Sequence, residues 1–527
     1  MAYVPDPDLI RVQLDPQGPW ADPARTAVGV SCLRDGDGLA VVVEAGGAVS
    51  RIHLRWRRQL PPDATILGDA WERTYGDVAW QAIRAEQLYP WMVVVHSPTE
   101  GSWGAGVDVR TGSFAGWSAD PAGVSLWLDL RAGADSVQLG ERTLTAAVVR
   151  WVTGDEAYET QCTLASAVCR DPLPVGPLVG ANNWYYAYGK DFGLDAVIRD
   201  ARMISELSGA HPVRPFAVVD DGWSVDGLAD GRPASGGPWD RGRGDFSSMA
   251  DAARAISAEG VRPGLWFRPL LWREQHPAAL RAWDGGFALD PSHPAAVDEV
   301  AASIHRFASW GFQLIKHDFS TYETLGRWGF QMGPHPAAPD VHVADRTRTT
   351  AEVLVDLYRA IHDAAGDVIV LGCNVVGHLA AGLVHAQRTG DDTSGRIWER
   401  TRRMGINTLA FRLAQNGRFF TVDADCVPST PQTDWALNRQ YLDLVARSGT
   451  ALFVSVDPAT RTDEVDADLA AALRIALDGG VAGGIEPLDW FSTTTPRRWR
   501  CGDEIRTYDW LPTFGGDPYD VGGTLFS

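Results

Sequence analysis

The sequence lacks long hydrophobic runs and carries no basic or apolar leader at its amino terminus. Apolar stretches such as residues 451–456 fall far short of the roughly 20 residues that a membrane-spanning helix needs. The opening residues, MAYVPDPDLIRVQLDP, combine acidic residues with prolines and differ from a secretory signal. We therefore expect a cytoplasmic protein with no membrane partner.

Positive charge and cysteine are also scarce. The chain has 47 basic against 67 acidic residues, a formal net charge of −20, and such a surface repels phosphate backbones. We therefore expect no nucleic-acid partner. The 6 cysteines are dispersed without a CxxC pair, which argues against a zinc ribbon and favours a reducing compartment over a disulfide framework. No pattern calls for a cofactor.

Tryptophan, in contrast, is abundant, with 22 residues. Aromatic faces stack on the C–H faces of sugar rings, although core packing is the commoner use of any single tryptophan. An acidic, tryptophan-rich chain therefore suits a neutral small-molecule substrate such as a sugar. At 527 residues the chain is too long for one compact core and predicts two or three domains.

The first part of the chain, residues 1–177, predicts a β-domain. Short β-branched and aromatic runs, such as residues 51–56, 91–96 and 143–152, alternate with turn-rich segments, and no helical period appears. This pattern is typical of a β-sandwich. Tryptophan-containing alternating runs return near the end of the chain and predict a small C-terminal β-domain over residues 481–527.

The central part, residues 178–480, alternates short strand-like runs with longer helical patterns. We expect strands at residues 182–188, 214–219, 262–267, 312–316, 368–373, 384–388, 418–422 and 451–454. Helical patterns cover residues 194–207, 249–259, 295–309, 346–364 and 435–448. The repeat predicts an α/β protein with a central (β/α)8 TIM barrel. A doubly wound sheet is less favoured, because no glycine-rich loop follows the first strand.

Aspartates follow three of the expected strands. Asp220 and Asp221 end the second, Asp318 ends the fourth, and Asp391 and Asp392 end the sixth. Each could be a helix N-cap, a position that aspartate favours. However, the carboxyl ends of barrel strands converge on one face, where the active sites of such barrels lie. The coincidence of three such strand ends therefore favours a shared functional site.

The neighbours of these aspartates indicate roles in glycoside hydrolysis. Retaining hydrolysis needs one ionised carboxylate and one protonated carboxyl group, about 5–5.5 Å apart. Lys316 lies two residues before Asp318 on the same strand face and would keep that carboxylate ionised. The adjacent Asp391 and Asp392, with Arg388 nearby, disfavour double ionisation and would supply the acid.

Five motifs recur in order along the barrel: NNWYYAYGKDF (182–192), VVDDGW (218–223), GLWFRP (264–269), WGFQLIKHD (310–318) and RTGDD (388–392). Together they resemble the clan of glycoside hydrolase families 27 and 36, the α-galactosidases, over residues 182–458. The similarity is closest to family 36. Such enzymes carry β-domains on both sides of the barrel.

The resemblance implies a role for each matching residue. Asp318 would be the nucleophile and Asp391 the general acid/base, with the adjacent Asp392 as the alternative if the register differs by one residue. The implied substrate-binding residues are Asp220 and Asp221 at the 4- and 6-hydroxyls, Lys316 at the 3- and 4-hydroxyls, Cys373 and Asn374 near the 2-hydroxyl, and Arg388, Asp392, Trp184, Trp266 and Arg268 around the sugar. Trp184 and Trp266 could equally belong to the barrel core.

Three positions depart from the family pattern. His317 replaces the usual Trp, Arg268 stands where many members have Glu, and Gly390 replaces Ser. On strand alternation His317 should point away from Asp318. Arg268 suits either a substrate clamp or a salt bridge. These departures bear on the identity of the sugar more than on the chemistry.

We therefore expect a retaining, exo-acting glycoside hydrolase that cleaves terminal α-galactosides of small oligosaccharides or glycosides. The same chemistry on an α-N-acetylgalactosaminide or α-glucoside, or transglycosylation, stays open. A metal-dependent barrel enzyme, with Asp220, Asp318 and Asp391 as Mg2+ ligands and Lys316 as base, is the alternative class. A non-catalytic sugar-binding protein is less favoured. We expect no metal, and a homo-oligomer is compatible with the sequence.

Overall fold

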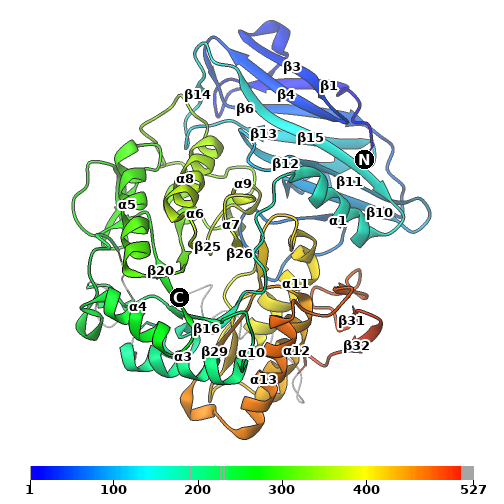
Figure 1. The fold of residues 1–527 in the computed structure, drawn as a ribbon. Helices are drawn as coiled ribbons and strands as arrows, with labels where there is room; N and C mark the ends of the chain where they lie inside the picture. The colour runs from blue at the N-terminus through cyan, green and yellow to red at the C-terminus, as the bar shows by residue number, and fades with distance from the viewer. Residues whose placement is uncertain (1, 190–191, 226–227, 230–231, 234–235, 512–527) are drawn as a thin grey trace.

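The structure is a computed structural model that describes residues 2–189, 192–225, 228–229, 232–233 and 236–511. Antiparallel sheets come first along the chain, followed by a large parallel sheet with its helices and then a small antiparallel sheet (Figure 1). No helix in the described ranges is both long and apolar enough to cross a membrane.

Two large antiparallel sheets form the N-terminal part. The first has the strand order β2 (Trp20–Ala21), β1 (Leu9–Gln13), β6 (Arg51–Arg57), β13 (Gly123–Asp129), β12 (Phe114–Asp120) and β9 (Tyr89–Pro90). The second has the order β3 (Val28–Asp35), β4 (Gly38–Ala45), β15 (Leu144–Gly154), β11 (Gly101–Val107), β10 (Met92–Ser97), β7 (Thr65–Gly68) and β8 (Gln81–Ala82). Strands β5 (Ala48–Val49) and β14 (Val137–Gln138) pair separately.

The core of this N-terminal part follows from strand alternation. In β6 every second side chain is buried, ending with Trp56. The Trp56 ring contacts Trp117 of its own sheet and Trp151 of the seven-stranded sheet, with centroid distances of 5.9 Å in both cases. The apolar faces of the two sheets therefore share a core. Helix α1 (Ala157–Val168) packs on β10, β11 and β15 of the second sheet.

The central parallel sheet has nine strands. Its order is β27 (Thr421–Asp423), β26 (Ala386–Arg388), β25 (Ile369–Gly372), β24 (Leu314–His317), β20 (Arg262–Phe267), β17 (Phe216–Val219), β16 (Val179–Asn182), β29 (Leu452–Val456) and β28 (Val427–Ser429). A parallel bridge joins Asp423 of β27, at one end of this order, to Ala451, which directly precedes β29 near the other end, so the sheet is barrel-like. Nearly every strand residue is buried, as expected of a parallel sheet covered on both faces.

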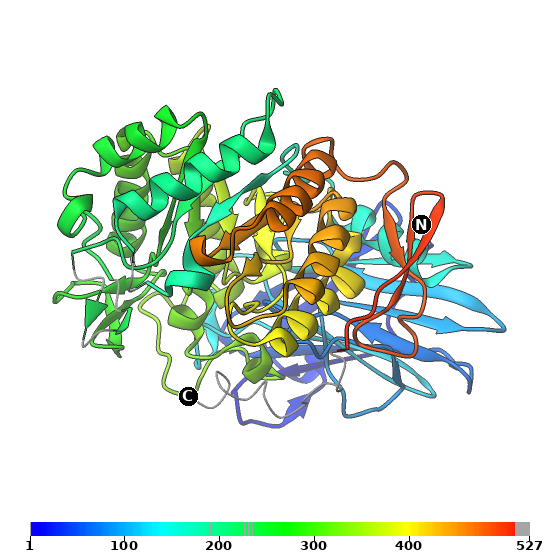
Figure 2. The same cartoon turned by 90° about the horizontal axis from the view of Figure 1, so that it is seen from below.

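Helices surround this sheet, as Figure 2 shows from below. The longer ones are α3 (Leu194–Ser208), α4 (Met249–Ala258), α5 (Pro294–Trp310), α8 (Thr350–Ala365), α12 (Trp435–Ser448) and α13 (Asp463–Leu477). The short ones are α2 (Trp184–Ala187), α6 (Ser320–Leu325), α7 (Gly329–Met332), α9 (Gly377–Ala380), α10 (Trp398–Thr401) and α11 (Asn407–Arg412), with a π-helical turn at Arg402–Ile406. 3-10 turns occur at Pro23–Arg25, Gly244–Phe246, Leu413–Gln415 and Pro458–Thr460.

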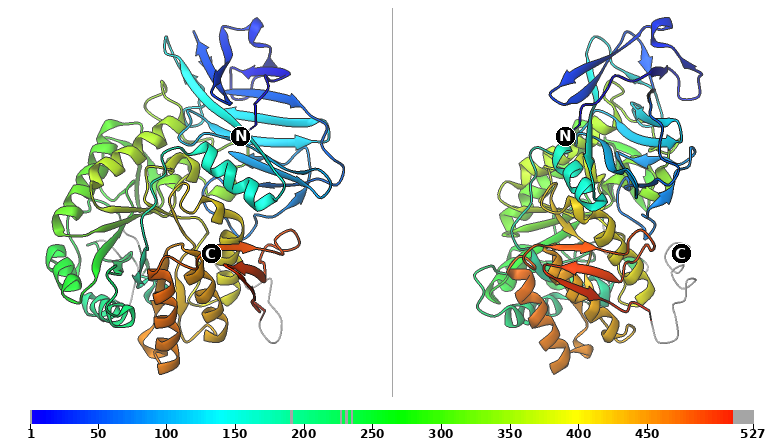
Figure 3. Two further views of the ribbon diagram at one scale, coloured as in Figure 1. Left: turned by 45° about the vertical axis from the view of Figure 1, so that its right-hand side comes forward. Right: turned by 90° about the vertical axis from the view of Figure 1, so that its right-hand side faces the viewer.

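Small antiparallel sheets complete the fold. Strands β21 (Leu271–Trp272), β23 (Gly286–Leu289) and β22 (Ala279–Trp283) form one, and β18 (Leu228–Ala229) pairs with β19 (Arg232–Pro233). The last sheet holds β30 (Ile485–Pro487), β31 (Arg498–Cys501) and β32 (Glu504–Thr507), beside α12 in Figure 3. The segment that follows β32 is joined to α10 by a 2.9 Å hydrogen bond from Trp398 Nε1 to the Trp510 carbonyl.

The predicted α/β class with a parallel, barrel-like sheet is confirmed. One strand prediction is wrong: of residues 182–188, only Asn182 belongs to a strand, and residues 184–187 form α2. The aromatic run there has high strand propensity, but the Asn182 side chain accepts a hydrogen bond from the Trp184 amide at 2.8 Å and turns the chain at the sheet edge. The predicted residues 512–527 of the C-terminal domain lie outside the described residues.

Candidate active site

A cavity of about 790 Å³ lies where the parallel strands end. All of the predicted site residues except Asn374 and Asp391 line it: Trp184, Asp220, Asp221, Trp266, Arg268, Lys316, Asp318, Cys373, Arg388 and Asp392. The cavity therefore brings together residues from β17, β20, β24, β25 and β26 or the turns that follow these strands. The ends of these strands therefore converge on one cavity, as the positions of the aspartates in the sequence predicted.

Asp220 and Lys316 form a buried ion pair in the wall. Lys316 Nζ lies 2.7 Å from Asp220 Oδ2, and Asn182 Nδ2 donates to the same oxygen at 2.5 Å. Burial lowers the pKa of Lys316, but the attraction of Asp220 outweighs it and leaves the pKa above its ordinary value. A charged ammonium and a fixed carboxylate thus stand side by side, which suits binding of vicinal hydroxyl groups.

Asp318 follows β24 directly and is held by two donors. The Phe319 amide donates to Oδ1 at 2.8 Å, and Trp266 Nε1 donates to Oδ2 at 3.3 Å. The backbone of Phe319 has φ 62°, a left-handed conformation that is uncommon for a bulky residue. His317 lies on the opposite strand face, is fully buried, and has a pKa lowered to about 4 by that burial.

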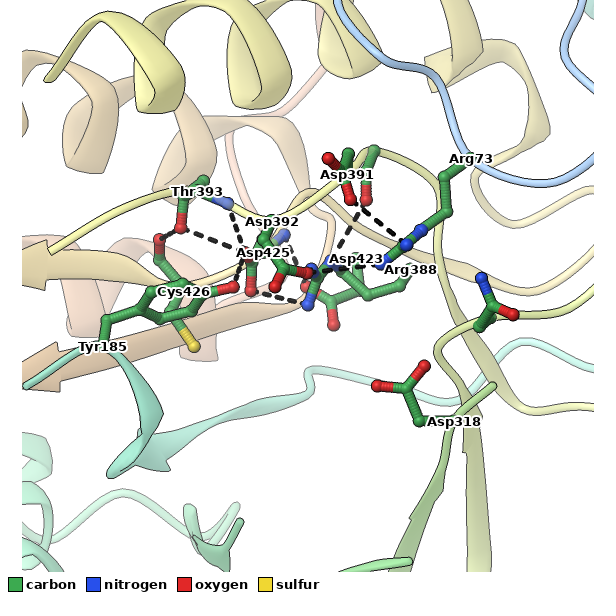
Figure 4. Close-up of polar contacts among 12 residues, drawn as sticks. Arg73, Tyr185, Asp318, Arg388, Asp391, Asp392, Thr393, Asp423, Asp425 and Cys426 are labelled. Carbon is green, nitrogen blue, oxygen red and sulfur yellow. Dashed lines mark hydrogen bonds and ion pairs between the residues drawn. The ribbon is translucent and has the colours of Figure 1, made fainter. Parts of the chain in front are cut away.

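Arg388, at the end of β26, is the centre of a second network, which Figure 4 shows. Its guanidinium lies 2.8 Å from Asp425 and 2.5 Å from Asp392. Asp425 in turn accepts a hydrogen bond from Tyr185 and one from the Thr393 amide at 2.7 Å. Burial lowers the pKa of Arg388, but its acidic and phenolic neighbours, Asp425 first, raise the pKa well above its ordinary value. A permanent positive charge therefore lies beside Asp392.

The adjacent Asp391 and Asp392 differ in orientation. The side chain of Asp392 is 37% exposed and lines the cavity, whereas that of Asp391 is 8% exposed and does not. Asp391 is paired with Arg400 at 2.6 Å and with Arg73 at 3.2 Å. Water exclusion raises the pKa of Asp392, but Arg388, followed by the other nearby cations, lowers it to about 2. The structure thus places Asp392 in the wall and Asp391 behind it.

The side chains of two further predicted residues, Arg268 and Asn374, are held by other residues of the protein. Arg268 lines the cavity and is salt-bridged to Glu323 and, at 2.8 Å, to Asp284, so it is a salt-bridge partner within the wall. Asn374 is fully buried, donates to Glu72 and accepts a hydrogen bond from the Tyr322 amide at 3.3 Å. These contacts occupy the Asn374 side chain behind the wall, away from the predicted 2-hydroxyl pocket.

An aromatic group that sequence reasoning missed forms part of the wall. Tyr322 stacks on Trp328 with a centroid distance of 4.1 Å, and Trp283 meets Tyr322 edge-on at 5.1 Å. The remaining lining residues that were not predicted are Tyr185, Tyr188, Asp284, Phe319 and Arg396. Tyr185 and Tyr188 belong to the motif at residues 182–192 but were not singled out, and the others lie in segments that no motif or period marks. Arg73 and Asp425 were missed for the same reason, because only the fold brings them to Arg388 and the two aspartates.

The donor set is poorly suited to a divalent cation. Of the three proposed Mg2+ ligands, Asp220 is paired with Lys316 and Asp391 with two arginines. Within the described residues, no group of three or more His, Cys, Asp or Glu side chains is placed to hold a metal ion. Two of the three carboxylates that this alternative needs as metal ligands are thus already paired with cations of the protein.

The fold is similar to those of α-galactosidases of known structure, including members of family 36. The α-galactosidase TtGalA from Thermus thermophilus, solved with p-nitrophenyl α-D-galactopyranoside, superposes with a TM-score of 0.60 at 18% identity, over 91% of this chain and 99% of that one. The family 36 α-galactosidase AgaA from Geobacillus stearothermophilus gives 0.59 at 13% identity, over 89% and 75%. AgaB from the same organism gives 0.60 at 12%, over 87% and 68%. No protein-family model matches the sequence.

Proposed function

We propose that the protein is a retaining, exo-acting glycoside hydrolase that cleaves terminal α-galactosides. The observation that carries this proposal is the single cavity that joins Asp318, Asp392 and the Asp220–Lys316 pair. The shared fold with α-galactosidases supports it. We further propose three domains, a β-sandwich (1–177), a (β/α)8 barrel (178–480) and a C-terminal β-domain (481–527).

Asp318 is the nucleophile in this proposal. The hydrogen bonds from the Phe319 amide and Trp266 fix the orientation of its carboxylate at the strand end. Asp220, Asp221 and Lys316 bind the hydroxyl groups of the sugar, and the rings of Trp184 and Trp266 offer apolar contact to its C–H faces. Cys373 lines the cavity as an uncharged thiol, since burial raises its pKa well above the ordinary value.

Asp392, rather than Asp391, is the general acid/base. Only Asp392 lines the cavity, and its contacts with Arg388 and Arg73 both involve Oδ1. Within the described residues, no hydrogen bond or ion pair reaches Asp392 Oδ2, which leaves that oxygen available to exchange a proton. Asn374 stabilises the wall through Glu72 and contributes no sugar contact.

The reaction follows by double displacement. Asp318 attacks the anomeric carbon as the bond to the leaving oxygen breaks, and Asp392 gives its proton to that oxygen. The product of this step is a glycosyl ester of Asp318. Asp392, now a carboxylate, takes a proton from water as the water oxygen attacks the same carbon and releases Asp318. Two inversions return the α configuration.

Initial rates on a panel of p-nitrophenyl α-glycosides test the proposal, with the wild type beside Asp318→Asn, Asp392→Asn and Asp391→Asn. We expect the α-galactoside to be cleaved fastest and Asp318→Asn to be inactive. On an unactivated galactoside, Asp392→Asn should lose about 100- to 10,000-fold, the usual value of general acid catalysis.

The Asp391→Asn variant is the matched control for the acid/base assignment. It should keep measurable activity, and added azide should trap an α-galactosyl azide with Asp392→Ala but not with Asp391→Ala. If the wild type prefers an α-glucoside or an α-N-acetylgalactosaminide, that sugar replaces galactose as the proposed substrate and the proposed chemistry stays the same. Full activity of Asp318→Asn would overturn the proposal.

A further inference from the structure

The segment after β7, residues 69–75, crosses from the N-terminal sheets to the loop that carries the two aspartates. The Thr74 amide donates to the Thr389 carbonyl at 2.8 Å, and the Asp391 amide donates to the Thr74 carbonyl at 2.8 Å. Thr74 and Gly390 thereby form a parallel bridge. The main chain before Asp391 and Asp392 is thus fixed by a residue that lies more than 300 positions earlier in the sequence.

Arg73, the neighbour of Thr74, bridges the two carboxylates. Its Nη2 lies 3.2 Å from Asp391 Oδ1, and its Nη1 lies 3.3 Å from Asp392 Oδ1. Its Nε lies 3.0 Å from Glu72 Oε1, and its side chain is 7% exposed. Figure 4 shows Arg73 reaching Asp391 from a segment separate from the strands of the cavity. A planar guanidinium contacts the three carboxyl groups through three separate nitrogens in a fixed fork, whereas a lysine offers a single nitrogen on a flexible stem.

The segment is anchored around Arg73 by buried contacts. Glu72 is fully buried, accepts hydrogen bonds from the Gly329 amide at 2.8 Å and from Tyr75 at 3.1 Å, and is bonded to Asn374. Arg412 donates to the carbonyls of Glu72 and Thr389, at 2.6 and 2.9 Å. Buried charges are costly unless they are paired and held in good geometry. The pairing here fixes the position of the Arg73 guanidinium.

We propose that Arg73 is a positioning residue for the acid/base, supplied to the cavity by the N-terminal part of the chain. It holds Asp392 Oδ1 together with Arg388, while Oδ2 exchanges the proton. It also holds Asp391, which keeps the loop in register. The inference rests on the proposed role of Asp392, and it makes the N-terminal part a component of the catalytic centre.

Charge around Asp392 gives the proposal a specific signature. The cations that face it are Arg73, Arg388, Arg400 and Lys316, and the uncharged titratable neighbours are Tyr185 and Tyr188. Asp391 and Asp425 share the nearby arginines. Loss of one cation favours the protonated form of Asp392 and raises its pKa. The general acid then stays protonated to higher pH, so the alkaline limb of kcat should move upward.

The test compares Arg73→Gln, Arg73→Lys and Arg142→Gln with the wild type. Arg142 is the matched control, because it also joins the N-terminal part to a barrel helix through Glu352, at 2.7 Å, but does not line the cavity. Each variant is assayed on an activated aryl and an unactivated α-galactoside, and kcat is measured against pH. Circular dichroism and galactose binding confirm that each variant is folded.

We expect Arg73→Gln to slow the unactivated substrate about 10-fold more than the activated one, since only the former depends strongly on the acid. Its alkaline limb should shift upward by more than about 0.5 pH unit. Arg73→Lys, which keeps the charge, should leave the limb in place but retain the substrate difference, and Arg142→Gln should show neither effect. If Arg73→Gln does not fold, Arg73→Lys provides the test. The proposal then requires that Arg73→Lys slow the unactivated substrate more than the activated one.

Equal slowing of both substrates with an unmoved pH limb would overturn the role of Arg73 and leave the proposed function intact. The same pattern in Arg142→Gln as in Arg73→Gln would also overturn it, because the effect would then be that of a weakened contact between the two parts. If the wild type cleaves no α-galactoside, or if Asp392→Asn keeps full activity on the unactivated substrate, the proposed function itself fails.

Discussion

In the proposed mechanism, one residue of register decides the chemical roles of the adjacent Asp391 and Asp392. Both lie at the end of the same strand, but Asp391 is enclosed by Arg73 and Arg400, while Asp392 lines the cavity. The sequence motif identifies the two aspartates but does not show which of them faces the cavity. That difference depends on the arginines that contact the pair, and two of these three arginines lie outside the RTGDD motif.

A pH profile tests the protonation of Asp392. Its pKa of about 2 in the unliganded protein keeps it ionised at neutral pH. Because the acid must be protonated, kcat/KM should rise as the pH falls from neutral. Bound substrate displaces water and raises the pKa of Asp392, so the alkaline limb of kcat should lie at higher pH than that of kcat/KM. Coincident limbs, measured on an unactivated α-galactoside, would contradict this account.

At the scale of elements, the loops after the strands determine what the cavity can hold. Trp283 of β22, Tyr322 of α6 and Trp328 before α7 come from three separate segments. Their rings pack together in the wall, and in the proposed function they offer an apolar surface to the group attached to the sugar. The short segments that carry them have no periodicity that a sequence argument could use.

Substitution of Trp283 tests this surface. Trp283→Ala should raise KM about 3- to 10-fold for a galactoside with an extended aglycone, because one aromatic contact is lost. Inhibition by free galactose should stay unchanged, since the proposed mechanism places the galactose ring beside Asp220 and not against Trp283. Equal weakening of both ligands, measured by steady-state kinetics, would show that Trp283 contacts the galactose ring instead.

Helix α8 offers a test of local stability. Thr349 caps it by accepting from the Glu352 amide at 3.1 Å, and its hydroxyl donates to the Gly112 carbonyl at 2.8 Å. Thr349→Ala should lower the free energy of unfolding by about 1–2 kcal/mol, the usual range for a lost N-cap. Thr349→Ser keeps the hydroxyl and should cost much less in the same denaturant titration. Equal losses in the two variants would assign the effect to the methyl group.

At the scale of the whole molecule, the parallel sheet was predictable, but the contacts that the N-terminal part makes with the cavity were not. Alternating strand and helix patterns, and aspartates at three strand ends, indicated the barrel-like sheet and most of the cavity wall. The crossing segment around Arg73 was not indicated, because its role depends on contacts with residues more than 300 positions away. The error at residues 184–187 has a local cause, since an asparagine side chain turned an aromatic run into a helix.

Metal removal tests the alternative enzyme class on the intact protein. Lys316 and the arginines supply positive charge where a metal-dependent site would place its ion. Extensive treatment with a chelator should therefore leave kcat/KM on an α-galactoside unchanged. Loss of activity that Mg2+ restores would favour the metal-dependent alternative.

The stereochemistry of the first product tests the central claim most directly. Time-resolved proton NMR of p-nitrophenyl α-galactoside hydrolysis, at high enzyme concentration, resolves the anomer released before mutarotation. The account predicts α-galactose first, because attack by Asp318 and then by water inverts the anomeric carbon twice. Initial release of β-galactose would mean a single displacement and would contradict the role of Asp318 as nucleophile.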